Sequence, residues 1–446
     1  MEEEKILIRN ASQVVTCSGF EAKKGKAMSD VGIIEDGAVA VSDGIITHVG
    51  PTEEVLRQVD VGDYLEVDAS GRALLPGFVD SHTHFVFGGY REEEFSWRMK
   101  GDSYMSIMER GGGIVNTMNA TRNASYDDLY GDAYDRLDTM MDMGVTTVEG
   151  KSGYGLDLAT ELIQLRVMKE LNDEHPLDVV STFLGAHAVP PEFAGRTDAY
   201  VDYIIEGVLP HVRAEHSVTF CDVFCEQGVF SVEQSERLLK AARSQRFKLK
   251  LHADEIVSFG GAELAARLKA VSADHLLHIS DTGIKRLARS GTIATLLPLT
   301  AFSLNEPYAP GRRMIDAGCA VALASDLNPG SCFSGSIPLL FALACIQMKL
   351  TPEEALTALT INGAAALGRE KKVGSIDVGK KADLVLLKFP SYKFLPYHIG
   401  MNIVDTVIKD GVLYIVLRMK IKCLILNNRH NACRFDNQRI SCRNGG

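Results

Sequence analysis

From Leu74 onward the chain alternates short apolar runs with longer amphipathic patterns, and this alternation restricts the possible folds more than any other feature. Patterns such as YDDLYGDAYDRLDTMMDMG and SVEQSERLLKAARSQ have the periodicity of helices. The apolar runs between them have the length of buried strands: residues 74–81, 144–149, 177–186, 219–225, 247–251, 271–277, 292–297 and 320–324. Strands and helices that alternate in this way over about 250 residues predict an α/β fold, a parallel (β/α)8 TIM-type barrel.

The segments on either side of the predicted barrel have the short alternating runs of β-structure. KILIRNASQVVT and GAVAVSDGIITHVG precede the barrel, and VGSIDVGKKADLVLLKF and NIVDTVIKDGVLYIV follow it. Because the two ends are alike in kind, we expect them to pair into one small β-sandwich. The predicted units are residues 1–72 and 371–416 for the two parts of this sandwich, and residues 73–370 for the barrel.

Residues 417–446 differ in composition from the rest of the chain. They contain seven Lys or Arg against one Asp, and three of the nine cysteines. A basic binding arm is one interpretation of such a segment. A loose appended sequence is the better one, so we predict an atypical basic tail that is disordered.

Composition excludes several classes of partner. The formal net charge of −11 argues against sequence-independent nucleic-acid binding, which needs a basic face. No apolar run approaches the roughly 18 residues of a membrane span, and the acidic start MEEEKILIRN is unlike a signal peptide. The cysteines are scattered among apolar neighbours, which is typical of reduced thiols. We therefore expect a cytoplasmic protein with a small-molecule substrate.

Polar side chains follow several predicted strands at the end where barrels of this kind carry their sites. His82 and His84 follow the first strand, His252 and Glu255 the fifth, His275 the sixth and Asp326 the eighth. A lone histidine at a strand end is more often a hydrogen-bonded polar residue than a ligand. Several candidates around one barrel mouth instead favour a metal site. His82, His84, His252 and Asp326 would be its four ligands, and one coordination position would stay open for water, as catalytic sites require.

The segments that carry these residues resemble the imidazolonepropionase family of the amidohydrolase superfamily, whose members are metal-dependent hydrolases. The matching motifs, which lie within residues 5–415, are SHTHFVFGGYREEEF, GVTTVEGKSGYGLD, FLGAHAVPPEF, HADE and SDLNPGSC. The resemblance implies that metal-activated water hydrolyses the cyclic amide C–N bond of 4-imidazolone-5-propanoate. The product would be N-formimino-L-glutamate, in the degradation of L-histidine. A homodimer is also implied.

The number of metal ions follows from the fourth strand. Superfamily members with two metals usually bridge them with a carboxylated lysine at the end of that strand, where this chain has Cys225 and Glu226. We therefore expect one ion per chain, zinc or iron. Lys151, after the second strand, is predicted to be a structural or substrate-side cation.

The resemblance also implies roles for individual residues. Glu255 would hold the attacking water or the ring nitrogen, and His275 would stabilise the developing oxyanion. Asp326 would pass a proton to the leaving nitrogen. Arg91 would bind the propionate of the substrate through two parallel hydrogen bonds. Substrate contacts are further expected from Tyr104, Tyr154, His187, Glu255, Asn328, Gly330 and Ser331.

Other interpretations stay open at this point. The same ligand set also resembles deaminases of heterocyclic amines, which would release ammonia. A barrel hydrolase can also be reused as a catalytically silent scaffold, although retention of every candidate ligand speaks against it. The segment Gly111–Gly113 is glycine-rich but lacks the Lys-Ser/Thr of a phosphate loop, so we predict a mobile segment over the mouth.

Overall fold

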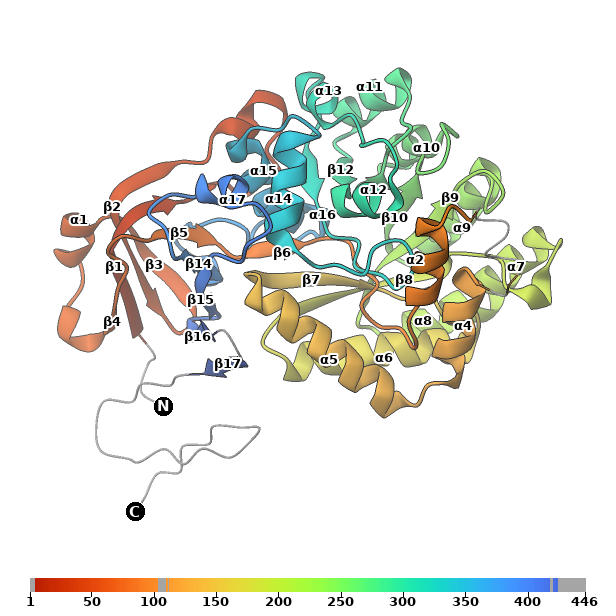
Figure 1. The fold of residues 1–446 in the computed structure, drawn as a ribbon, viewed down its shortest axis with the longest axis horizontal. Coiled ribbons are helices and arrows are strands. Elements are labelled where there is room, and N and C mark those ends of the chain that lie inside the picture. Colours follow the sequence, from red (N-terminus) through yellow and green to blue (C-terminus); the bar gives the residue numbers. More distant parts are fainter. Residues whose placement is uncertain (1–4, 103–109, 111, 418–419, 424–446) are drawn as a thin grey trace, which may run out of the picture.

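A barrel and a smaller β-sheet lie side by side in the computed structural model, which describes residues 5–102, 110, 112–417 and 420–423 (Figure 1). Within these residues the barrel is one eight-stranded sheet, with parallel strands in the order β6 to β13. The strands are β6 (Phe78–Asp80), β7 (Val145–Lys151), β8 (Asp178–Ala186), β9 (Val218–Cys225), β10 (Lys248–Ala253), β11 (Ser272–His275), β12 (Ile293–Leu296) and β13 (Val321–Leu323). The predicted (β/α)8 barrel is confirmed.

Backbone hydrogen bonds beyond the ends of β6 and β13 bring the barrel close to closure. The N–H of Asp326 donates to the carbonyl oxygen of His82 at 3.0 Å, and the N–H of His84 donates to that of Leu327 at 2.8 Å. Three candidate site residues are therefore part of the seam that joins the first and last strands.

The apolar run predicted as one strand, residues 74–81, is two strands in the structure. β5 (Ala73–Pro76) pairs with strands of the smaller sheet, whereas β6 pairs with β7 in the barrel. The chain changes sheets at Gly77, where a Cβ atom would lie 2.2 Å from Oγ1 of Thr146. Only glycine fits this crossing without a shift of its neighbours.

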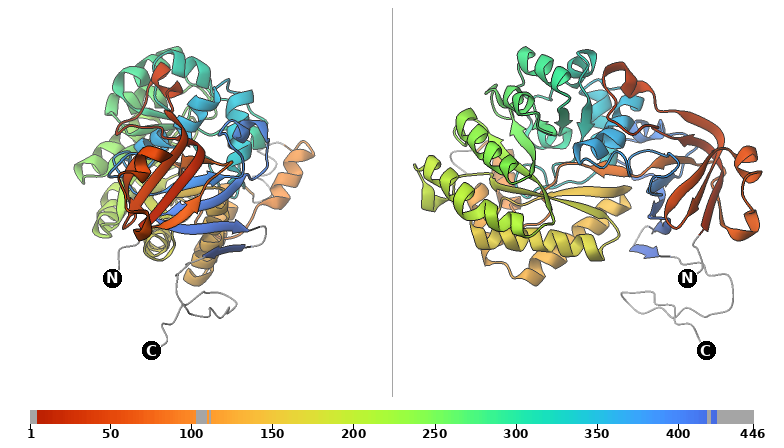
Figure 2. Two further views of the ribbon diagram at one scale, coloured as in Figure 1. Left: turned by 90° about the vertical axis from the view of Figure 1, so that its left-hand side faces the viewer. Right: turned by 180° about the vertical axis from the view of Figure 1, so that it is seen from behind.

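The smaller sheet contains strands from both ends of the chain. Its nine described strands run in the order β17-β16-β15-β14-β5-β1-β2-β3, with β4 beside β1. The remaining bounds are β1 (Lys5–Val15), β2 (Ile33–Ser42), β3 (Ile45–Pro51), β4 (Leu65–Asp68), β14 (Leu384–Leu387), β15 (Val404–Lys409), β16 (Val412–Leu417) and β17 (Lys420–Cys423). Figure 2 shows the N-terminal strands in red beside the C-terminal strands in blue. The two ends thus share one β unit, as expected.

Part of the predicted tail belongs to this sheet. Residues 420–423 form β17, which pairs antiparallel with β16. The tail residues 418–419 and 424–446 lie outside the described residues.

Helices cover the outside of the barrel and close one of its ends. Their starts follow local signals, such as the capping boxes of Ser125, Ser231 and Thr351. The bounds are α1 (Thr52–Leu56), α2 (Glu92–Met99), α4 (Ile114–Asn123), α5 (Tyr126–Asp142), α6 (Leu158–Glu174), α7 (Thr197–Tyr203), α8 (Leu209–Ala214), α9 (Val232–Ser244), α10 (Gly261–Leu268), α11 (Asp281–Ser290), α12 (Pro298–Leu304), α13 (Gly311–Asp316), α14 (Ile337–Ile346), α15 (Pro352–Leu359), α16 (Ile361–Ala366) and α17 (Phe394–Tyr397).

Helix α16 packs against β6, β12 and β13. Ala364 from this helix shares a buried apolar cluster with Val79, Val180 and Phe220 of the barrel strands. This packing fills the barrel interior on the α16 side, and the histidines lie at the carboxyl ends of the strands.

Two further observations concern the predicted environment of the chain. None of the described helices is long and apolar enough to cross a membrane. Within the described part, Cys17, Cys221, Cys225, Cys319, Cys332 and Cys345 carry free thiols.

Candidate metal and substrate site

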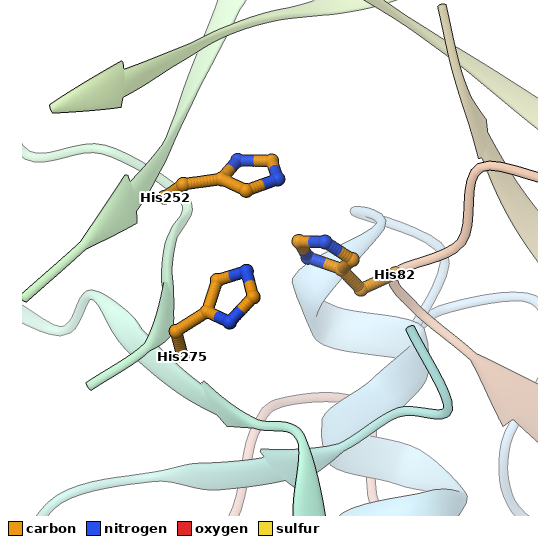
Figure 3. A group of neighbouring side chains, drawn as sticks. All are labelled: His82, His252 and His275. Carbon is orange, nitrogen blue, oxygen red and sulfur yellow. The ribbon is translucent and has the colours of Figure 1, made fainter. Parts of the chain in front are cut away.

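Three imidazoles and one carboxylate converge at the carboxyl ends of the barrel strands. Oδ1 of Asp326 lies 3.5 Å from Nε2 of His82 and 3.7 Å from Nε2 of His84. Nε2 of His84 lies 3.5 Å from Nε2 of His252. The structure therefore groups ligand atoms of His82, His84 and Asp326 within 4.8 Å of one another, while His252 lies beside His84 and forms further groups with His82 and His275 and with His84 and His187. Figure 3 shows His82, His252 and His275 with their rings toward one another.

The chemistry of this donor set fits a metal ion. His82, His84, His252 and Asp326 are at most 2% exposed, and Nε2 of His82 has no hydrogen-bond partner among the described residues. Burial lowers the pKa of each of these three imidazoles well below the ordinary value, which keeps a lone pair free for coordination. Nitrogen and oxygen donors of this kind suit zinc and iron.

Two buried carboxylates lie against the Nδ1 atoms of two of these imidazoles. Nδ1 of His82 donates to Oδ2 of Asp274 at 2.7 Å, and Nδ1 of His252 lies 3.1 Å from Oδ2 of Asp222. When Nδ1 faces a carboxylate, Nε2 is the nitrogen that remains for the metal. Asp222 and Asp274 are thus outer partners of the site, which the sequence interpretation missed.

These aspartates belong to a group of buried charged residues that we call the barrel ion cluster: Lys151, Lys250, Glu149, Asp222 and Asp274. All five side chains are 0% exposed. The Nζ atom of Lys151 lies 2.7 Å from Asp222, 3.2 Å from Glu149 and 3.4 Å from Asp274. Lys151 therefore contacts carboxylates inside the barrel, which corresponds to the structural alternative considered for it. For Asp222 the sequence signal was a charged residue within a largely apolar strand, VTFCDVFC.

Glu255 and His275 lie together on one side of the metal position. Nε2 of His275 is 3.5 Å from Oε2 of Glu255. Burial, together with nearby Asp326 and Glu226, raises the pKa of Glu255 well above its ordinary value. Burial also lowers the pKa of His275 to about 3, so its imidazole is neutral. Glu226 accepts the backbone N–H of Glu255 at 3.0 Å and thereby fixes this turn.

Asp326 combines burial with a constrained backbone. Burial raises the pKa of its carboxyl group to about 7, although a 2.6 Å hydrogen bond from Oγ1 of Thr300 acts in the opposite direction. Its φ is +54°, and that of His275 is +75°. Such left-handed backbone at non-glycine residues costs roughly 1–3 kcal/mol each and is common in active sites.

Arg91 lies at the rim of the mouth, in a position fixed by Glu94. The buried Glu94 carboxylate accepts from Nε of Arg91 at 2.8 Å and also from Gly113 N–H and Asn116 Nδ2, each at 3.0 Å. Gly330 lies so close that a Cβ atom there would be 2.1 Å from Nη1 of Arg91. A close approach of this kind requires glycine. Sequence reasoning did not identify Glu94.

The loop after β13 forms the other side of this rim. Oδ1 of Asn328 accepts the backbone N–H groups of Gly330 and Ser331 at 2.9 and 2.8 Å. Arg91, Gly330 and Ser331 line an open cavity of about 1090 Å³. The imidazoles of the metal position are not part of its lining.

Tyr154 and His187 complete the wall beside the metal position. The ring of His187 stacks on that of His84, with centroids 4.9 Å apart and an interplanar angle of 12°. The Tyr154 ring lies 5.2 Å from that of His187. Glu161 accepts the backbone N–H groups of Gly153, Gly155 and Leu156, which fixes the loop around Tyr154.

Some predicted positions cannot be placed. Tyr104 and Gly111 lie outside the described residues, so the predicted substrate contact of Tyr104 stays a prediction.

Comparison with known proteins gives consistent results. Residues 214–414 match the model of the amidohydrolase family. A protein of Parabacteroides distasonis named imidazolonepropionase is 77% identical over 93% of this chain and 100% of its own length. One of Clostridium tetani with the same name is 61% identical over 92% of this chain and 98% of its own length.

Solved structures with lower identity share the fold. An adenosine deaminase from Xanthomonas campestris with bound zinc superposes with a TM-score of 0.65 at 20% identity, covering 93% of this chain and 94% of its own. The guanine deaminase of E. coli gives 0.66 at 15% identity, covering 92% and 98%. At these identities the similarity shows the barrel architecture alone.

Proposed function

Because this chain belongs to the imidazolonepropionase family of the amidohydrolases, we propose that its barrel mouth is where the ring-opening reaction of that family takes place. The protein is a hydrolase that acts on the C–N bond of a cyclic amide. It converts 4-imidazolone-5-propanoate to N-formimino-L-glutamate in L-histidine degradation. The observation that supports this site is the close approach of the buried His82, His84 and Asp326, with Nε2 of His252 3.5 Å from Nε2 of His84.

The same four side chains are the proposed ligands of one metal ion, zinc or iron. When bound, such an ion supplies Lewis acidity, which makes water a stronger nucleophile at neutral pH. The buried imidazoles are already neutral, so no proton has to be removed from them first.

Glu255, His275 and Asp326 are the proposed catalytic residues. The neutral His275 imidazole can donate a hydrogen bond to the oxyanion that develops at the cyclic amide carbonyl. Burial raises the pKa of the Asp326 carboxyl to about 7, so this group can accept and release a proton near neutral pH, and burial also raises the pKa of Glu255 above its ordinary value. We assign transfer of a proton to the leaving ring nitrogen to Asp326, and positioning of water or the ring nitrogen to Glu255.

Arg91 is the proposed partner of the substrate propionate. A guanidinium group binds a carboxylate through two parallel hydrogen bonds, and Glu94 fixes its plane at the rim. The other proposed substrate contacts are Tyr104, Tyr154, His187, Glu255, Asn328, Gly330 and Ser331.

Two properties outside the site complete the proposal. Free buried thiols such as Cys17 and Cys221 suit the reducing cytoplasm, where we place the enzyme. We also propose a homodimer, because exposed apolar side chains gather beside the mouth at Phe95, Met99 and Phe302. Light scattering of the purified protein measures its mass in solution, which should be twice the mass of one chain.

The decisive experiment measures which bond is cleaved. The purified chain is incubated with 4-imidazolone-5-propanoate, and N-formimino-L-glutamate is quantified beside the metal content of the protein. In parallel, guanine and adenosine are supplied and ammonia is measured. We expect ring opening, with about one equivalent of metal per chain. Ammonia release alone would identify a deaminase, and inactivity of the metal-loaded protein on every substrate would identify a silent scaffold.

A further inference from the structure

We propose that Lys151 is a positioning residue for the metal site, because its ammonium group clamps the two carboxylates that orient His82 and His252. The inference rests on the proposed metal site and assigns a role to a residue that takes no part in the proposed chemistry. Lys151 ends β7, and the carboxylates that it contacts come from β9 and β11 across the barrel interior.

Two series of contacts lead from Nζ of Lys151 to the imidazoles, one through Asp222 and one through Asp274. Nζ of Lys151 lies 2.7 Å from Oδ2 of Asp222, and the same oxygen lies 3.1 Å from Nδ1 of His252. Nζ lies 3.4 Å from Oδ2 of Asp274, which accepts from Nδ1 of His82 at 2.7 Å. A single side chain therefore fixes the outer partners of two proposed ligands that are far apart in the sequence.

Burial makes this clamp necessary. Asp222, Asp274 and Glu149 have no exposure to solvent, so water cannot screen their mutual repulsion. Without a shared cation, the two aspartates would move apart, and this movement would release the imidazoles from their orientation. Loss of an outer partner of a metal ligand typically reduces metal affinity by about 10–100-fold.

Lys250 is a natural comparison within the same cluster. Its Nζ lies 2.6 Å from Oε2 of Glu149 and 3.1 Å from the carbonyl oxygen of Ser81. These two contacts reach neither aspartate directly. Lys250 therefore contacts Glu149 and influences Asp222 and Asp274 through its charge alone, whereas Lys151 contacts both aspartates directly.

The test compares Lys151→Met with Lys409→Met. Lys409 is also a buried lysine paired with aspartates, but it lies where the nine-stranded sheet meets the barrel. The zinc dissociation constant of each metal-free variant is measured by competition with a chromogenic chelator, and thermal unfolding is recorded without metal. We expect Lys151→Met to bind zinc about 10–100-fold more weakly, and Lys409→Met to keep the wild-type affinity. Unchanged zinc affinity in Lys151→Met, or an equal loss in both variants, would overturn the proposal.

A second variant covers the case in which Lys151→Met does not fold. In Asp274→Asn the amide oxygen can still accept from His82, but the negative charge that Lys151 holds is gone. We expect zinc affinity to fall, because the carboxylate that connects Lys151 to His82 is gone. If Lys151→Met folds, its double variant with Asp274→Asn should lose less than the sum of the two. Wild-type affinity in Asp274→Asn would contradict the clamp.

These outcomes are separable from those of the proposed function. A wild-type chain that binds zinc but opens no ring would contradict the proposed reaction and leave the clamp supported by affinities. Normal ring opening with unchanged zinc affinity in Lys151→Met would contradict the clamp alone.

Discussion

Among the buried lysines of the described residues, Lys151 and Lys409 each contact three carboxylates, and they differ in what those carboxylates contact next. In the barrel ion cluster, Asp222 and Asp274 face Lys151 on one side and imidazoles on the other. At the junction between sheet and barrel, Lys409 pairs with Asp383, Asp178 and Asp410 at 3.0, 3.3 and 2.7 Å. We call this second group the junction ion cluster.

The surroundings of the junction ion cluster are purely structural. Asp383 accepts the backbone N–H of Asp410, and Asp178 also pairs with Lys381. Asp178 and Asp410 are 33% and 45% exposed, whereas the carboxylates of the barrel cluster are fully buried. A buried ion pair is by itself weak evidence of stabilisation or of function. The role of each carboxylate depends on what it contacts besides the lysine. Substitutions in the junction ion cluster should therefore change the free energy of unfolding, and substitutions in the barrel ion cluster should change metal binding and activity.

The largest expected difference is between two buried aspartates with raised pKa values. Burial raises the pKa of Asp326 to about 7 and that of Asp383 to about 6. Asp326→Ala should reduce kcat/KM by roughly 10³-fold or more, because it removes a metal ligand and a proton-transfer group. Steady-state ring-opening kinetics and metal analysis measure this loss.

The matched control for that measurement is Asp383→Ala. Per folded molecule it should keep activity within about threefold of wild type, since Asp383 contacts no site residue and distant sites are nearly independent. Full activity in Asp326→Ala would contradict the mechanism. Equal losses in both variants would remove the distinction between the clusters.

The second prediction concerns the junction lysine. Lys409→Met leaves the buried Asp383 without its main cation, and the free energy of unfolding should fall by about 3 kcal/mol. Urea denaturation followed by circular dichroism measures the change, while kcat and KM of the folded enzyme should stay at wild-type values. An unaltered unfolding midpoint would mean that the junction ion cluster contributes nothing net.

The comparison also shows where sequence reasoning succeeds. Apolar runs placed the barrel strands closely, as with residues 144–149 for β7, because a buried strand must be apolar along its length. The candidate ligands were found because parallel strands present their carboxyl ends at one mouth. The change of sheets at Gly77 was missed because the residues on both sides of it are apolar and buried, although Pro76-Gly77 in the middle of the run was a signal of an interruption.

The outer contacts of the site were not predictable for a different reason. Asp274 and His82 are 192 residues apart, and their hydrogen bond exists only because the barrel closes. A charged residue within an apolar strand, such as Asp222, indicates an inward-facing partner without identifying it. Lys151 was singled out in the sequence, but the sequence does not show whether its side chain points toward the substrate or into the barrel, and this direction separates its two predicted roles.

The third prediction tests the rim of the mouth, where an arginine has its own carboxylate partner. Arg91→Lys keeps the charge but loses the paired hydrogen bonds, so KM should rise about 10–100-fold with little change in kcat. Gly330→Ala should act in the same direction, because its methyl group would displace Arg91. Initial-rate kinetics separate the two parameters. A fall in kcat at constant KM would instead place Arg91 in the chemical step.

The smallest effect is the pH dependence of the junction ion cluster. Burial raises the pKa of Asp383 to about 6, against an ordinary value of 3.8, even though Lys409 lowers it. A group with a higher pKa in the folded state binds its proton more tightly there, so its contribution to stability is full below pH 3.8 and is lost as the pH rises through 6. Lys409→Met removes the attraction that favours the ionised carboxylate and should raise this pKa further. The stability gap between wild type and Lys409→Met should therefore narrow by roughly 1 kcal/mol from pH 8 to pH 5, as measured by denaturation at each pH. A gap that is constant across this range would show that Asp383 does not take up a proton when its lysine is removed, and that the partly exposed Asp178 and Asp410 dominate the cluster.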